Sequence, residues 1–191
     1  HFPRSQTSNS LSDETETPAP EPLPRLGLRE TLSSVIDTED GLAWACAQLS
    51  LGEGPIGLDA ERASGYRYSQ RAYLIQVRRH GSGTFLIDPT GFEDLSELNN
   101  VIGSQEWILH AATQDLMCLR DEGLRPTSLF DTELAGRLLN LPRVGLASLV
   151  EHYLGMTMAK EHSAADWSTR PLPESWLEYA ALDVEVLAEL R

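Results

Sequence analysis

The order of strand-like and helix-like segments is the feature that most restricts the fold of this chain. Residues 55–61 have the pattern of a short strand, and the β-rich runs 73–79 and 83–88 flank the turn-forming residues 80–83, which predicts a hairpin. A compact apolar strand is expected at 107–110, and helical spacing occurs at 41–51, 94–101, 113–122, 131–140, 146–154 and 174–191. Strands joined by tight turns, followed by strand–helix alternation, predict an α/β fold with a mixed sheet flanked by helices.

The first 24 residues differ in composition from the rest of the 191-residue chain. They are rich in Ser, Thr, Glu and Pro, with proline at positions 18, 20, 22 and 24. Such a segment buries too little apolar surface to offset its ordering entropy. We therefore expect a disordered tail at 1–24 and one folded domain at 25–191, a length that suits a single core.

The net charge of −14 argues against a protein that coats nucleic acid through a general positive field. A negative net charge is compatible with an enzyme that binds phosphates through divalent cations. No apolar run approaches the roughly 20 residues that span a bilayer, and no secretory signal is visible, so no membrane contact is expected. Cys46 and Cys118 lie far apart in apolar-patterned segments, which is typical of free thiols in a reducing, cytoplasmic setting.

The segment Asp59-Ala60-Glu61 is a candidate metal site. Residues two apart on a strand share a face, so the two carboxylates project together. Neighbouring carboxylates repel one another unless a cation lies between them, and hard oxygen ligands suit Mg²⁺ or Mn²⁺. A solvated polar strand face explains the same pattern, so this motif alone leaves both interpretations open.

Two later segments place further acidic residues where sites are often built. A strand ends at His110, and Asp115 is expected in the first turn of the next helix, near the carboxyl end of a strand. The helix dipole also favours an acid there without any function. On the last helix, Tyr179 and Asp183 are four residues apart and share a largely apolar face, where an acid is unfavourable unless it is paired or metal-bound. A partly exposed aspartate next to a core tyrosine explains the same spacing.

Together, these segments resemble the motifs of the DEDD exonuclease superfamily, in its tyrosine-bearing branch, and in particular the ribonuclease D family. The resemblance runs in order from about residue 28 to the end. It rests on Asp59-Ala60-Glu61, Tyr73-Leu74-Ile75-Gln76, Leu86-Ile87-Asp88-Pro89, His110-Ala111-Ala112-Thr113-Gln114-Asp115-Leu116, Asp131-Thr132, Lys160, Asp166-Trp167, Arg170-Pro171-Leu172 and Tyr179-Ala180-Ala181-Leu182-Asp183-Val184. The chain departs from the family at Glu161 and His162, where a serine and an acid are common.

The resemblance implies an RNase H-like fold with a mixed five-stranded sheet, and a 3′–5′ exoribonuclease that releases nucleoside 5′-monophosphates from RNA 3′ ends. It implies two divalent ions, Mg²⁺ or Mn²⁺, held by Asp59, Glu61, Asp115 and Asp183. Tyr179 would orient the attacking water, because a phenol with a pKa near 10 is a poor base at neutral pH. Family members usually carry a helical HRDC module after the nuclease domain, and we expect this chain to lack it.

Contacts with substrate are expected at His110, Gln76, Arg62 and Lys160. A basic and aromatic stretch is a further candidate surface for single-stranded RNA, with solvated arginines as the alternative; it comprises Arg62, Tyr66, Arg67, Tyr68, Arg71, Tyr73, Arg78 and Arg79. The expected partners are single-stranded RNA 3′ ends, such as those of tRNA precursors or other structured RNAs. A 3′–5′ DNA exonuclease and a catalytically silent RNA-binding module remain as alternatives, because no motif reveals recognition of the 2′-hydroxyl.

Overall fold

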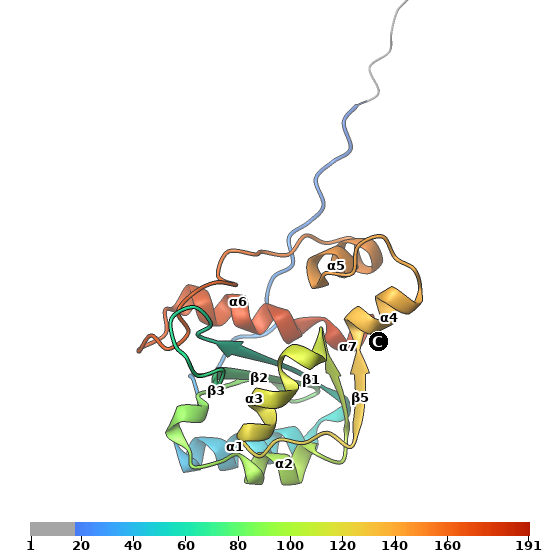
Figure 1. The fold of residues 1–191 in the computed structure, drawn as a ribbon. Helices are drawn as coiled ribbons and strands as arrows, with labels where there is room; N and C mark the ends of the chain where they lie inside the picture. The colour runs from blue at the N-terminus through green and yellow to red at the C-terminus, as the bar shows by residue number, and fades with distance from the viewer. Residues whose placement is uncertain (1–17) are drawn as a thin grey trace, which may run out of the picture.

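The computed structural model describes residues 18–191 (Figure 1), so residues 1–17 of the predicted tail lie outside the described residues. Residues 18–24 are exposed and belong to no helix or strand. The backbone N–H of Leu26 donates to the carbonyl of Thr157 at 2.7 Å, and the N–H of Thr157 donates to the carbonyl of Pro24 at 2.9 Å. The chain is therefore held against the body of the protein from Pro24 onward, at the predicted domain boundary, which itself stays a prediction.

A single five-stranded sheet of order β3-β2-β1-β4-β5 forms the centre of the protein. The strands are β1 (Glu53–Arg62), β2 (Ala72–His80), β3 (Gly83–Ile87), β4 (Glu106–Leu109) and β5 (Ser128–Asp131). The β1–β2 and β2–β3 pairs are antiparallel, whereas the β1–β4 and β4–β5 pairs are parallel. The predicted mixed sheet is confirmed, including the hairpin formed by β2 and β3.

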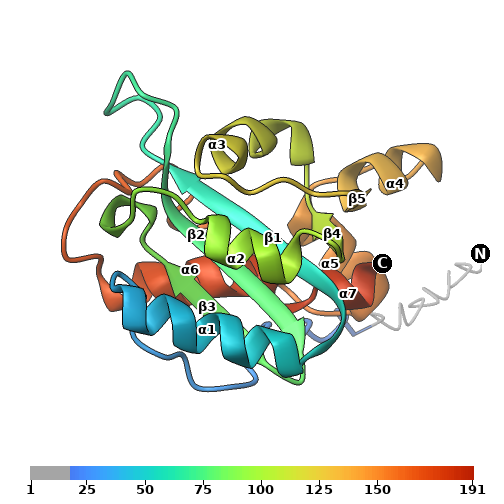
Figure 2. The same ribbon diagram turned by 90° about the horizontal axis from the view of Figure 1, so that it is seen from below.

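Helices cover both faces of this sheet (Figures 1 and 2). They are α1 (Glu39–Leu51), α2 (Ser96–Ile102), α3 (Leu116–Asp121), α4 (Thr132–Leu138), α5 (Leu146–Leu154), α6 (Glu174–Glu185) and α7 (Leu187–Leu190), with short 3₁₀ turns at Pro89–Gly91 and Ala112–Gln114. The helices α1 and α2 lie on one face of the sheet and α6 on the other. No helix within residues 18–191 combines the length and the apolar character that crossing a membrane requires.

The alternation of side chains along β1 explains this layering. Ile56, Leu58 and Ala60 are buried in the core that α1 and α2 cover. The intervening residues Asp59 and Glu61 point toward the opposite face, as the period of two in a strand requires. One face of β1 is thus apolar core, and the other carries the two carboxylates toward α6.

Three segments differ from the prediction. The helix expected at 113–122 is a 3₁₀ turn followed by α3, with Asp115 at the junction rather than in the first helical turn. The helix expected at 174–191 breaks at Val186, which has a non-helical φ of −117°. The sequence pattern does not predict β5, because its four residues at the edge of the sheet are half-buried or exposed and have little hydrophobic periodicity.

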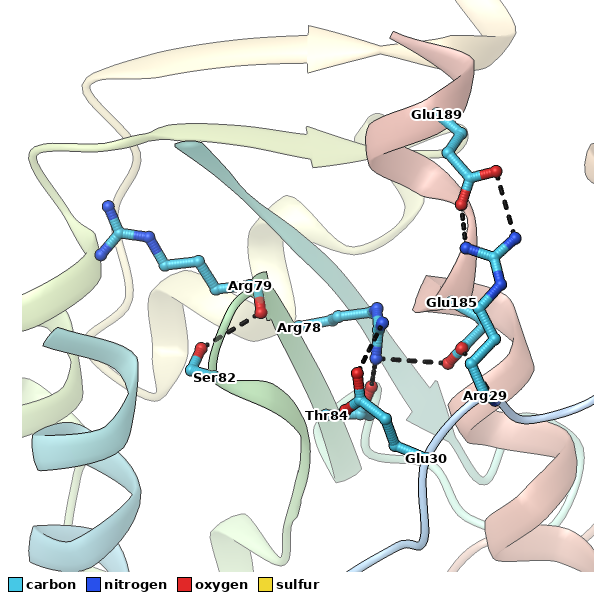
Figure 3. Close-up of polar contacts among 8 residues, drawn as sticks. All are labelled: Arg29, Glu30, Arg78, Arg79, Ser82, Thr84, Glu185 and Glu189. Carbon is cyan, nitrogen blue, oxygen red and sulfur yellow. Dashed lines mark hydrogen bonds and ion pairs between the residues drawn. The ribbon is translucent and has the colours of Figure 1, made fainter. Parts of the chain in front are cut away.

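The end of α6 is fixed by a buried carboxylate (Figure 3). Glu185 is only 4% exposed, and its side chain accepts a hydrogen bond from the backbone N–H of Arg29 at 3.1 Å. Its other oxygen lies 3.4 Å from a guanidinium nitrogen of Arg78 on β2, and Arg29 also pairs with Glu189 on α7. Because a buried carboxylate is stable only when it is paired, these contacts determine the position of α6 relative to the sheet.

Candidate active site

Three carboxylates from β1 and α6 converge at one end of the sheet. The side chains of Asp59, Glu61 and Asp183 each offer an oxygen atom, and these atoms all lie within 4.8 Å of one another. Asp59 and Glu61 reach this position because they share a face of β1. Asp183 reaches it from α6, which begins after Pro173, a residue whose fixed φ suits a helix start.

The carboxylates of this group are buried and repel one another. Burial raises the pKa of Asp59, and it raises the pKa of Glu61 and Asp183 well above the usual values, with repulsion from Asp59 adding to the effect on both. An oxygen-only donor set with this much mutual repulsion matches the ligands that Mg²⁺ and Mn²⁺ prefer. The three residues therefore fit the divalent ion that the sequence predicted there.

Asp115 lies beside this group rather than within it. It is buried, and one of its carboxylate oxygens lies 3.9 Å from a guanidinium nitrogen of Arg62. Burial and repulsion from Asp59 raise the pKa of Asp115 to about 8. Asp115 and Asp59 line the same cavity, and a second cation held between them would relieve the repulsion between their carboxylates.

Asp131, to which the sequence analysis assigned no role, holds the turn that leads to Asp115. Its carboxylate accepts hydrogen bonds from the backbone N–H groups of Ala111 at 3.0 Å, Ala112 at 2.9 Å and Glu133 at 2.9 Å. Ala111 has a φ of +56°, an unfavourable value for alanine that these bonds help to maintain. The family resemblance at Asp131-Thr132 was the only signal in the sequence for this residue.

Tyr179 lies one helical turn before Asp183 and lines the same cavity. Its ring packs against those of His162 and Trp167, with centroid distances of 5.6 and 6.4 Å. Burial raises the pKa of Tyr179 above its usual value, and repulsion from Asp183 adds to this. The phenol is therefore neutral at physiological pH and can orient a water molecule by hydrogen bonding. His162, one of the two departures from the family pattern, thus contacts the ring of Tyr179.

The cavity at this site has a volume of about 520 Å³. Arg62 and His110, two of the four residues predicted to contact substrate, line it. Burial lowers the pKa of His110, so its ring is neutral near pH 7. The ring nitrogen Nδ1 lies 2.9 Å from the Thr132 hydroxyl, which fixes the orientation of the ring.

Gln76 and Lys160, the other two predicted contacts, are not among the lining residues. Gln76 is fully buried on β2, and its amide donates to a carboxylate oxygen of Glu61 at 3.0 Å and to the carbonyl of Ala180 at 3.1 Å. Its position fits the orientation of Glu61 rather than contact with a substrate. Lys160 is exposed on the segment between α5 and α6. A contact between Lys160 and substrate stays a prediction.

The predicted basic and aromatic stretch does not form one surface. Figure 3 shows the side chains of Arg78 and Arg79 leaving β2 in opposite directions, and neither residue lines the cavity. Arg78 faces Glu185 and Glu30, while Arg79 is buried and donates to the carbonyl of Leu49 at 2.9 Å. Successive residues of a strand point to opposite faces, so Arg78 and Arg79 contact different segments of the protein.

Comparison with known proteins decides the family. A family model described as "3'-5' exonuclease" matches residues 34–191. The chain belongs to this exonuclease family. Its relatives include the protein named ribonuclease D of Escherichia coli (strain K12), to which it is 38% identical over 154 residues, covering 78% of this chain and 40% of that protein. The predicted relation to ribonuclease D is confirmed.

Solved structures agree with this assignment. The crystal structure of a protein from Bifidobacterium adolescentis matches with a TM-score of 0.85 and 48% identity, covering 89% of this chain and 42% of that one. The crystal structure of Escherichia coli RNase D, described as an exoribonuclease involved in structured RNA processing, matches with a TM-score of 0.73 and 36% identity, covering 84% and 44%. DNA polymerase I of Aquifex aeolicus (strain VF5) is also related, at 34% identity over 120 residues, covering 63% of this chain and 21% of the polymerase. The chain thus spans about two fifths of the length of its ribonuclease D relative.

Proposed function

We propose that this chain is the catalytic domain of a metal-dependent exoribonuclease that removes nucleoside 5′-monophosphates from RNA 3′ ends. The observation that carries the proposal is the convergence of Asp59, Glu61 and Asp183 within 4.8 Å, with Asp115 and Tyr179 beside them. All four carboxylates and the tyrosine of the predicted set are therefore near one cavity. A silent binding module would not need to keep this repulsive acidic group.

In this proposal, Asp59, Glu61 and Asp183 would hold one divalent ion, and Asp59 and Asp115 would hold a second. Two such ions, Mg²⁺ or Mn²⁺, would supply positive charge near the reacting oxygens and lower the pKa of the attacking water. Tyr179 orients that water through its neutral hydroxyl. Gln76 fixes the orientation of the Glu61 carboxylate by donating a hydrogen bond to one of its oxygens.

The substrate contacts that we propose are those of the cavity wall. Arg62 lies at the mouth of the acidic group, where its charge can meet a phosphate, and His110 offers a neutral ring beside it. The net charge of this protein is −14, which repels RNA. Bound cations would make the charge at the active site positive and so reduce that repulsion where the RNA end binds. Tyr179 lines the same cavity as His110, so we expect a terminal nucleotide bound there to contact both side chains.

We propose 3′ ends of single-stranded RNA as the substrate, including those of tRNA precursors and other structured RNAs. This agrees with the description of the Escherichia coli relative as an enzyme of structured RNA processing. The free thiols of Cys46 and Cys118 are buried, and we expect the enzyme to act in a reducing cytoplasm. The relation to a DNA polymerase keeps DNA as the second candidate substrate, because the same carboxylates can serve either nucleic acid.

A time course on 5′-labelled single strands tests the proposal. RNA and DNA of equal sequence are incubated with the protein in Mg²⁺, in Mn²⁺ and in EDTA. We expect RNA to shorten stepwise from its 3′ end in either metal and to remain intact in EDTA. Equal or faster shortening of DNA would favour the second candidate, and hydrolysis in EDTA would exclude the two-ion account.

A further inference from the structure

The loop between β1 and β2, residues 63–71, carries two tyrosines that pack little against the rest of the protein. Tyr68 is fully exposed, and Tyr66 is 58% exposed. Figure 2 shows this loop standing clear of the sheet beyond the ends of β1 and β2. Exposed aromatic side chains that lie together on one short loop are typical of a binding surface.

The loop is nevertheless held in a defined position beside the active site. The hydroxyl of Tyr66 donates to the carbonyl of Ala164 at 3.2 Å, and Nε of Arg67 donates to the hydroxyl of Ser168 at 3.1 Å. Ala164 itself lines the catalytic cavity. The loop is therefore bound to the segment that contributes Ala164 to the cavity wall, and these contacts fix the position of Tyr66 and Arg67.

The surface of the loop continues directly from the catalytic cavity. Arg62 and Ser64 line the cavity, and the next residues, 65–68 together with Gln70, line a second hollow of about 480 Å³. A strand whose terminal nucleotide occupies the catalytic cavity must leave it along one wall. The wall that passes Arg62 leads to a hollow rich in aromatic groups.

We propose that Tyr66 and Tyr68 form a stacking surface for the unpaired bases upstream of the 3′-terminal nucleotide, with Arg67 near the phosphates. This inference rests on the proposed function, which it deepens. Aromatic rings bind any base through its face, while a guanidinium can stack or meet a phosphate. Such a surface would favour single-stranded ends of several nucleotides over very short ones, without preference for sequence.

The kinetic test compares two substrates and three variants. Single-stranded RNAs of 2 and 12 nucleotides are digested in Mg²⁺ by the wild type, Tyr68→Ala, Tyr66→Ala and Tyr68→Phe. We expect each alanine variant to raise KM for the 12-mer about tenfold with kcat unchanged, and to leave the dinucleotide kinetics unaltered. Tyr68→Phe should retain the wild-type KM, because its ring can still stack.

Tyr153→Ala is the matched control, because Tyr153 is an exposed tyrosine on α5 that does not line the cavity. It should leave both substrates unaffected. Unchanged KM for the 12-mer in Tyr66→Ala and Tyr68→Ala, or equal effects on both RNAs, would overturn the stacking surface. The proposed function would survive that result, since it requires only metal-dependent hydrolysis by the wild type.

A binding measurement tests the loop even if hydrolysis is absent. The same variants and the otherwise unaltered chain, each carrying Asp183→Asn to prevent hydrolysis, are titrated in Mg²⁺ against a fluorescein-labelled 12-mer RNA, and anisotropy is recorded. We expect Tyr68→Ala to weaken binding about tenfold and Tyr153→Ala to have no effect. Equal affinities would overturn the inference and favour a protein as the partner of this loop.

Discussion

The guanidinium of Arg170 donates two hydrogen bonds to the carboxylate of Asp88, with nitrogen–oxygen distances of 2.9 and 3.0 Å. The same guanidinium donates to the carbonyls of Tyr73 and Trp167, each at 2.8 Å. Arg170 stands in the segment that leads into α6, and Asp88 directly follows β3. This pair therefore ties the start of the helix that carries Tyr179 to the sheet.

Arg170→Lys tests that tie. A lysine cannot reproduce the forked geometry of the guanidinium, so we expect the free energy of unfolding to fall by about 2–3 kcal/mol. Urea unfolding measures it. Arg137→Lys is the control, because Arg137 forms an exposed pair with Glu133 and should change stability by less than about 0.5 kcal/mol. Equal losses in both variants would contradict the structural role of Arg170.

Asp183→Asn should abolish hydrolysis without unfolding the protein. The variant removes one of the three converging carboxylates, so we expect the single-turnover rate to fall at least about 10³-fold. Because the metal-free group is repulsive, the variant should also resist urea at least as well as the wild type. Glu178→Gln, an exposed change on the same helix, serves as the control and should keep full activity. Turnover retained in Asp183→Asn would remove Asp183 from the metal set.

Tyr179→Phe should slow hydrolysis about 10- to 100-fold and leave the metal requirement unchanged, because only the hydroxyl that orients water is lost. Single-turnover rates at a series of Mn²⁺ concentrations separate the two effects. An unchanged maximal rate would show that the hydroxyl is dispensable. A shift in the Mn²⁺ dependence would show instead that Tyr179 supports metal binding.

Gln76→Leu distinguishes a positioning role from a substrate contact. The substitution removes the amide that donates to Glu61, so we expect the Mg²⁺ concentration for half-maximal activity to rise about 10- to 100-fold. At saturating Mg²⁺, KM for RNA should be close to that of the wild type, since Gln76 does not line the cavity. If Gln76→Leu raised KM and left the Mg²⁺ dependence unchanged, the result would support the predicted contact between Gln76 and substrate.

The metal-free protein should lose stability as the pH rises from 4 to 8. Burial raises the folded-state pKa of Asp59. Burial together with repulsion from Asp59 raises the pKa of Glu61 and Asp183, and it raises that of Asp115 to about 8. Groups with a raised pKa favour the folded state below their unfolded pKa of about 4, and this contribution is lost as the pH rises through the folded pKa. Urea unfolding in EDTA measures the trend. Asp115→Asn should flatten it, and so should Mg²⁺ or Mn²⁺ in the wild type. If Asp115→Asn and the wild type had the same pH dependence of stability, the raised pKa of Asp115 would be contradicted.

The parts of the site that follow from local periodicity were predictable. Alternation on β1 placed Asp59 and Glu61 on one face, and the spacing of four placed Tyr179 beside Asp183. Their convergence was suggested only by the family resemblance, because no local rule brings α6 across β1. The five-stranded sheet likewise came from the resemblance, since the exposed residues of β5 carry no periodic signal.

The parts that depend on distant contacts were not predictable. Gln76 was expected at the substrate, but the pairing of β2 with β1 sets Gln76 opposite Asp59 and buries it behind the acidic group. Asp131 received no role, although its carboxylate holds the turn at Ala111 and Ala112. In both cases, the function of the side chain depends on a strand pairing that sequence spacing does not reveal.

Because Asp59 comes from the first strand and Asp183 from the penultimate helix, the two halves of the acidic group are synthesised far apart in time. A growing polypeptide that has already formed β1 and β2 still lacks the helix that completes the trio. During translation, the proposed nuclease would therefore be unable to hydrolyse its own messenger RNA until almost the whole domain has left the ribosome.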